Sequence, residues 1–218
     1  MLAPHTPVLI AGAGPVGLTL AVDLAWRGVQ CLVVDPQTEI NPHPRAISIG
    51  VRSMEHFRRL GLDDEVIDAG VPRAHALDVV YVTRIAGREV FRFRIPSIED
   101  LSNRRDALAR EIPEVGASPY YKTWTAQTPL ERVLRRRASR EVRIDARYGW
   151  RLDGFVEHDD HVAARLIELV SGRVEKVTAT YLVGCDGAQS AVRGGLGIRM
   201  EGKGALGAAR GLYFREIG

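Results

Sequence analysis

One hexapeptide near the N-terminus restricts the possible folds of this chain more than any other feature. The segment Gly12–Gly17 (GAGPVG) follows the short apolar run Val8–Ala11, which is typical of a strand buried on both faces. Pro15–Arg27 comes next, and its polar residues recur at every fourth position, so they form one narrow stripe on a mostly buried helix. A second apolar run, Val29–Val34, follows Gly28, a residue type that often ends helices. This order of strand, glycine turn, helix and strand predicts a right-handed βαβ unit in a parallel sheet.

The glycine spacing of the hexapeptide suits a bound dinucleotide. Gly12 permits the tight turn, Gly14 lets the backbone approach a pyrophosphate, and Gly17 lets the helix pack closely on the strand. Pro15 and Val16 begin the helix, whose N–H groups and positive end would face the phosphates, so we place both in the same candidate site. The alternative interpretation is an ordinary βαβ turn that binds no ligand.

The second apolar run ends in an acid, Asp35. A carboxylate at this point can accept hydrogen bonds from the ribose hydroxyls of an adenosine. It also disfavours a ribose 2′-phosphate, because two negative charges would meet. The loop is therefore predicted to hold the ADP half of FAD or NAD rather than that of NADP.

Composition excludes several classes of protein. Of the 218 residues, 45% are hydrophobic and 26% are charged, the ordinary balance of a globular chain. No window approaches 18 uncharged apolar residues and no basic stretch precedes an apolar core at the start, so we expect neither membrane association nor a signal peptide. Aromatic residues make up only 6%, too few for a stacking platform, so nucleic-acid binding is not expected. Cys31 and Cys185 lie in apolar surroundings and fit a reducing, cytoplasmic location without a metal site.

The rest of the chain predicts further helices and strands. We expect helices over 51–60, at 66–67, and after Thr128, whose Thr-Pro-Leu-Glu sequence is a capping-box pattern with proline at the first helical position. The charged stretch 98–118 is expected to be an irregular surface excursion. Ser190 is expected to cap a short helix. Strands are expected over 77–83, 89–95, 142–145, 149–157, 161–170, 174–185 and 211–215.

The helix after Thr128 carries five arginines beside its buried stripe. Runs of charge are usually solvated, so we interpret these side chains as a solvated helical face. An anion-binding patch is the alternative. The five residues are Arg132, Arg135, Arg136, Arg137 and Arg140.

Five motifs in a fixed order resemble those of one protein family. Besides the glycine loop, they are Pro44–Ala46, Arg52–Glu55 leading to Leu60–Leu62, Gln127 before Leu130–Glu131, and Tyr181–Arg193. The order is similar to that of the FAD-dependent aromatic hydroxylases, the single-component flavoprotein monooxygenases similar to p-hydroxybenzoate hydroxylase and phenol hydroxylase. The resemblance is closest to the branch of phenol, hydroxyphenylpropionate and polyketide hydroxylases. It covers residues 7–198 apart from 98–120.

The resemblance implies an α/β fold and a division into segments. The fold is a Rossmann-like FAD-binding fold with a parallel central sheet, a β-meander insertion and the beginning of a β-sheet substrate domain. The expected segments are a Rossmann-like FAD-binding segment over 1–75, substrate-side strands with the irregular excursion over 76–120, the remainder of the FAD-binding domain over 121–200, and the first strand of the substrate domain over 201–218. The family's second Gly-Asp FAD motif does not follow Arg193. We therefore expect the N-terminal half of a longer enzyme and leave open a homodimer formed through exposed surface.

The resemblance also implies roles for four residues outside the loop. Arg45 and Gln127 match family positions that contact FAD, and an arginine fork suits phosphate oxygens. Asp186 and Gly187 match an Asp-Gly motif that lies beside the pyrophosphate and is implicated in binding the nicotinamide cofactor. From the residues alone, Arg45 would be interpreted as a surface arginine. The structural alternative for Asp186 is an Asx-turn that stabilises the corner between a strand and a helix. No catalytic residue is assigned.

The function implied by the resemblance is that of an FAD-dependent monooxygenase. With NADPH or NADH as co-substrate, such an enzyme hydroxylates a phenol-like aromatic substrate with O2 through a flavin C4a-hydroperoxide, and the cofactor supplies the difficult chemistry. Two alternatives stay open, namely another FAD oxidoreductase of the same fold and a fragment without catalytic competence.

Overall fold

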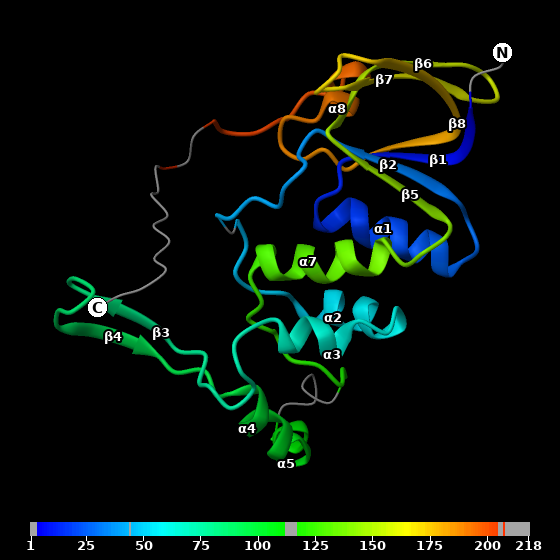
Figure 1. The fold of residues 1–218 in the computed structure, drawn as a ribbon. Helices are drawn as coiled ribbons and strands as arrows, with labels where there is room; N and C mark the ends of the chain where they lie inside the picture. The colour runs from blue at the N-terminus through cyan, green and yellow to red at the C-terminus, as the bar shows by residue number, and fades with distance from the viewer. Residues whose placement is uncertain (1–3, 44, 112–116, 205–206, 208–218) are drawn as a thin grey trace. The chain divides into compact units, whose positions relative to one another are not determined.

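The computed structural model describes residues 4–43, 45–111, 117–204 and 207 (Figure 1). The chain divides into two compact units, one made of Met1–His43 with Leu134–Gly218 and the other of Pro44–Val133. The segment boundaries expected at residues 75, 120 and 200 stay a prediction. The strand expected over 211–215 lies outside the described residues.

A six-stranded, mostly parallel sheet organises the first unit, in the order β5-β2-β1-β8-β7-β6. β1, β2, β5 and β8 run parallel, with Val8 level with Cys31 on one side and with Tyr181 on the other. β7 and β6 complete the sheet as an antiparallel meander. The predicted α/β fold with a parallel central sheet is confirmed, and the loops after β1, β2 and β8 leave the sheet at the same edge. The strands are β1 (His5–Ala11), β2 (Cys31–Asp35), β5 (Ile144–Tyr148), β6 (Trp150–Glu157), β7 (Val162–Glu168) and β8 (Val174–Gly184).

The central strand β1 is buried on both faces, as its continuous apolar run predicts. Leu9 and Ala11 belong to a buried cluster that includes Leu152 and Leu166 of the meander. The next side chain along, Ile10, is fully buried and points to the opposite face by the alternation of the strand. Figure 1 shows β6 and β7 over one face of the parallel strands and helix α1 (Pro15–Trp26) on the other. The end of β1, from which the glycine loop begins, is therefore anchored from both sides.

The second unit contains an exposed hairpin among short helices. β3 and β4 pair in antiparallel fashion, and large apolar side chains of both strands are exposed. Helix α7 (Gln127–Ala138) begins in this unit and ends in the first. The helices and hairpin strands predicted before residue 96 are confirmed. The other elements are α2 (Val51–Arg59), α3 (Asp63–Asp68), β3 (Val79–Val82), β4 (Glu89–Phe93), α4 (Ile98–Asn103) and α5 (Arg105–Glu111).

The irregular excursion predicted for residues 98–118 is wrong over its first part, where α4 and α5 form. Ser97 precedes α4, and its Oγ accepts a hydrogen bond from the Asp100 N–H at 2.9 Å. The Asp100 carboxylate accepts one from the Ser97 N–H at 3.3 Å. This reciprocal capping box satisfies two free donors at the helix start and outweighs the high charge of the segment. A smaller correction concerns α7, which begins at Gln127, so that Pro129 is its third residue rather than its first.

Candidate functional site

The turn after β1 packs against a segment that is far away in the sequence. Gly12 has a φ of +105°, which favours glycine, and its N–H donates to the Val34 carbonyl at 2.8 Å. A Cβ at this position would lie 2.4 Å from the Cys185 carbonyl oxygen and 2.9 Å from the Asp186 nitrogen. The loop after β1 therefore touches the loop after β8, and no side chain fits at position 12.

The other two glycines of the loop have different surroundings. A Cβ on Gly17 would lie 1.9 Å from the Gly12 carbonyl oxygen, so Gly17 holds α1 close against the loop. Gly14 is the N-cap of α1 with an ordinary φ of −75°, and, apart from the adjoining residues, no atom of the described chain lies within 4 Å of its Cβ position. It borders an open space at the positive end of the helix, beside Pro15 and the exposed Val16. The open space beside Gly14, which a side chain at this position would occupy, fits a pyrophosphate.

Asp35 ties the end of β2 to the glycine loop. Its Oδ2 accepts a hydrogen bond from the Ala13 N–H at 2.6 Å, and its Oδ1 accepts one from the Gln37 N–H at 2.8 Å. Each carboxylate oxygen can accept a second hydrogen bond, and the residue is only half-buried, so the carboxylate can still meet a ribose hydroxyl. The link to Ala13 was not predicted, because a bond to a main-chain N–H elsewhere in the chain has no sequence signal.

Asp186 follows β8 and binds the start of the next helix, α8 (Ala191–Gly195), whose N-cap is Ser190, as predicted. Its Oδ2 accepts hydrogen bonds from the N–H groups of Ala191 at 2.6 Å and Val192 at 3.3 Å. Asp186 therefore stabilises the corner between β8 and α8, but through N–H groups five and six residues further on and not through an Asx-turn. Its Oδ1 is buried and has no hydrogen-bond partner among the described residues. Because a buried acceptor without a donor is costly, a hydroxyl group or a water held by a ligand would be stabilising there.

Arg45 and Gln127 lie in the second unit. Arg45 is exposed, and the carbonyl of the next residue, Ala46, accepts a hydrogen bond from the Gln127 N–H at 2.9 Å. The Gln127 side chain donates from Nε2 to the buried Glu131 carboxylate at 2.7 Å. These two predicted residues are thus neighbours. The structure separately gathers the other eight in the first unit, at the ends of β1, β2 and β8: Gly12, Gly14, Pro15, Val16, Gly17, Asp35, Asp186 and Gly187.

Neither cysteine has the surroundings of a reactive thiol. Burial raises the pKa of the Cys31 thiol to about 11. Burial, together with the Asp186 carboxylate, also raises the pKa of Cys185. Protonated thiols are poor nucleophiles and poor metal ligands. In the part of the chain that the structure describes, no three His, Cys, Asp or Glu side chains are grouped to hold a metal ion, and no helix combines the length and hydropathy needed to cross a bilayer.

Comparisons with known proteins agree with the geometry of the loop. Residues 5–215 match a family model described as an FAD binding domain. The tetracenomycin B2 monooxygenase-dioxygenase of Streptomyces olivaceus is 34% identical over 216 residues. The chain belongs to the FAD-dependent aromatic hydroxylases. Another similar protein is the tetracenomycin A2 monooxygenase-dioxygenase of Streptomyces glaucescens, which is 32% identical over 220 residues. The aligned regions cover 96% and 99% of this chain but only 39% and 38% of these two relatives.

Solved structures of flavin enzymes share the fold of this chain. The rebeccamycin biosynthetic enzyme RebC with reduced flavin superimposes with a TM-score of 0.76 at 38% identity, over 90% of this chain and 35% of that one. The flavin-dependent monooxygenase PieE, in complex with FAD and substrate, has a TM-score of 0.79 at 32% identity, over 92% of this chain and 34% of that one. The chain therefore spans little more than a third of the length of these proteins.

Proposed function

We propose that this chain is the FAD-binding part of a flavin monooxygenase that uses NADPH or NADH and O2 to hydroxylate a phenol-like aromatic substrate. The observation that carries the proposal is the open space beside Gly14 at the positive end of α1. Asp35 and Asp186, at the ends of the strands on either side of β1, flank the same loop. The names of the relatives support the reaction class, since both are monooxygenases and both are named for tetracenomycins.

The residues of the first unit would hold the ADP half of the cofactor. The first N–H groups of a helix have no partner within the helix, so those of Val16 and Gly17 are suited to the pyrophosphate oxygens. Gly14 would let the phosphates approach the main chain. Asp35 would accept hydrogen bonds from the ribose hydroxyls while it keeps the Ala13 N–H in place.

The remaining predicted residues would contact other parts of FAD. The Asp186 Oδ1 would accept a hydrogen bond from the cofactor or from a water that the cofactor holds, and Gly187 leaves room for that approach. The Arg45 guanidinium would bind a phosphate oxygen. The Gln127 side chain, whose Nε2 is engaged by Glu131, would offer its Oε1 as an acceptor.

When bound, FAD would supply the redox chemistry of a reaction in which the nicotinamide cofactor gives two electrons, one oxygen atom of O2 enters the aromatic ring and the other leaves as water. The contribution of the described residues would be to bind the cofactor and to orient its adenosine and pyrophosphate. Catalytic residues stay unassigned.

A labelling experiment with the FAD-loaded protein tests this function. A panel of phenolic and polycyclic aromatic compounds is incubated with NADPH or NADH under 18O2, and products are analysed by mass spectrometry. We expect one labelled oxygen atom in the product of at least one compound, with a preference for one nicotinamide cofactor. Reduction of the bound flavin that yields no labelled product across the panel would favour the two alternatives, namely another FAD oxidoreductase of the same fold and a fragment without catalytic competence.

A further inference from the structure

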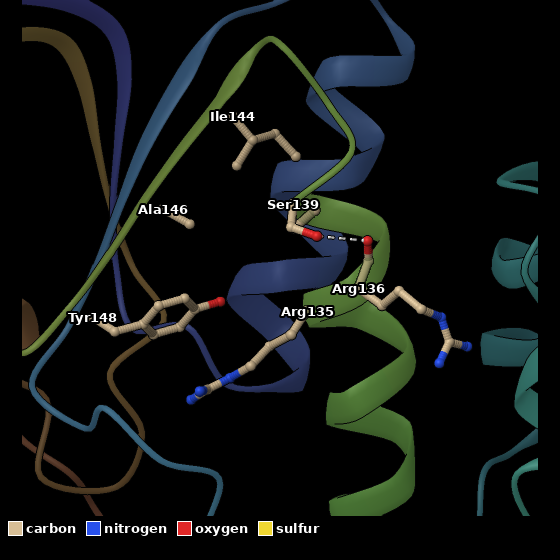
Figure 2. Close-up of a pocket in the computed structure, with 7 residues that line it drawn as sticks. Arg135, Arg136, Ser139, Ile144, Ala146 and Tyr148 are labelled. Carbon is tan, nitrogen blue, oxygen red and sulfur yellow. Dashed lines mark hydrogen bonds between the residues drawn. The ribbon is translucent and has the colours of Figure 1, made fainter.

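Arg135, in the last turn of α7, differs from a solvated arginine in what its guanidinium touches. One N–H, on Nη1, donates a hydrogen bond to the Thr38 carbonyl at 2.9 Å. The guanidinium carbon lies 4.1 Å from the centre of the Tyr148 ring, and Figure 2 shows the two side chains facing each other between α7 and β5. The residue is half-buried. Arg135 therefore departs from the solvated face predicted for the five arginines of this helix. Thr38, Arg135 and Tyr148 form what we call the Arg135 clamp.

The Arg135 clamp is next to the end of β2. Tyr148 is the register partner of Asp35 in the pairing of β5 with β2, and Thr38 follows Asp35 closely in the chain. Between them lies Gln37, whose N–H binds the Asp35 carboxylate. Arg135 thus joins α7, the end of β5 and the loop that carries one of the two donors to Asp35.

One side of the clamp is not covered by packed side chains. A hollow of about 450 Å³ lies beside it, and α7 and β5 line this hollow with Arg136, Ala138, Ser139, Ile144 and Ala146 as well as Arg135 and Tyr148 (Figure 2). Close packing normally fixes a buried side chain; here the hydrogen bond and the ring contact of Arg135 must do so. The Arg135 Nε is buried without a partner among the described residues, which is a cost that these two contacts offset.

We propose that Arg135 is a positioning residue for the adenosine end of the cofactor site. By fixing the Thr38 carbonyl, it holds the loop after β2 in the conformation in which Gln37 binds the Asp35 carboxylate and keeps that carboxylate directed to the ribose. The inference rests on the proposed function, because it takes FAD as the ligand. A lysine cannot replace Arg135, since only a planar guanidinium stacks on a ring while one of its N–H groups reaches a carbonyl.

Hydrogen–deuterium exchange of the ligand-free chain tests the clamp itself. Arg135→Gln should speed the exchange of the amides of Gln37, Thr38 and Glu39 several-fold. Arg136→Gln is the matched control, because it removes the same charge at the next position, where the side chain points away from Tyr148 (Figure 2), and it should leave these amides unchanged. Unchanged exchange in Arg135→Gln would overturn the proposal whatever the chain binds.

Ligand titrations test the consequence for the cofactor site. Arg135→Gln and Arg135→Lys should each weaken the binding of FAD and of ADP about tenfold, as expected for the loss of one charge-assisted contact. FMN, which lacks the adenosine, should bind these variants like the wild type, and Arg136→Gln should bind all three ligands like the wild type. The proposal would be overturned if the Arg135 variants lost affinity for FAD and FMN equally, or if Arg136→Gln lost as much affinity for FAD as Arg135→Gln. A wild-type chain that binds neither FAD nor ADP would overturn the proposed function and the adenosine role together, while the exchange result still shows whether the clamp forms.

Discussion

Replacing Gly14 by alanine should separate cofactor binding from folding. The φ of −75° at Gly14 suits any residue, and, apart from the adjoining residues, no atom of the described chain lies within 4 Å of the new Cβ. The free energy of unfolding of the ligand-free chain should therefore change by less than about 1 kcal/mol, because alanine restricts the unfolded chain more than glycine does but is the poorer N-cap residue. The binding of FAD should weaken at least about tenfold, since the methyl group would occupy the space that the pyrophosphate needs.

Gly17→Ala is the matched control, because it adds the same methyl group within the same loop. Its Cβ would lie 1.9 Å from the Gly12 carbonyl oxygen, so α1 would have to move away from the loop, and overpacking of this kind costs about 1–3 kcal/mol or more. Chemical denaturation gives the unfolding free energies of both variants, and titration with FAD followed by flavin fluorescence gives the dissociation constants. A folded Gly14→Ala chain that binds FAD as tightly as the wild type would refute the reasoning. So would a loss of stability in Gly14→Ala as large as that in Gly17→Ala.

Further predictions concern three other side chains, Asp35, Cys31 and Phe91. Asp35→Ala should weaken the binding of FAD more than the binding of FMN. It should also lower the free energy of unfolding by about 1–3 kcal/mol, because two backbone N–H groups lose their acceptor. Titrations in which the affinities for both flavins fall alike would contradict a ribose contact. Cys31 should react slowly with a thiol reagent at about pH 8, because only about one thiol in a thousand is ionised at that pH, and faster as the pH rises toward its raised pKa of about 11. A reaction rate at about pH 8 equal to that of the unfolded chain would contradict the raised pKa. Phe91 is 57% exposed on an apolar hairpin, so the chain should self-associate and Phe91→Arg should favour the monomer; a monomeric wild type in sedimentation experiments would be the contrary result.

The βαβ unit could be predicted from the sequence because its signals are local. The apolar run before Gly12, the glycine spacing and the helical periodicity all lie within a short stretch of chain. The helix end is equally local, since Gly28 adopts a φ of +82° and the Val29 N–H after it donates to the Leu24 carbonyl at 2.9 Å. Helix α4 has a local signal as well, in the spacing of Ser97 and Asp100, and this capping pair is a better indicator than the charge of the segment that led to the wrong prediction.

Other features of the site depend on contacts between distant segments and could not be predicted. The sequence places Gly12 in a tight turn, but no feature of the sequence indicates that the loop packs against the Cys185 carbonyl. Asp35 could be recognised as a ribose ligand, whereas its bond to the Ala13 N–H exists only in the folded chain. The arginines of α7 look alike in the sequence, and only the packing of α7 against β5 distinguishes Arg135 from the others.

Competition between FAD and ADP for the unmodified chain tests most directly whether the loop Gly12–Gly17, with Asp35, holds the ADP half of a flavin. Isothermal titration with FAD should show one binding site per chain. ADP should then displace the bound FAD completely, because both ligands would place a pyrophosphate beside Gly14 and a ribose beside Asp35. A chain that binds no FAD, or FAD that ADP fails to displace, would contradict this assignment of the loop.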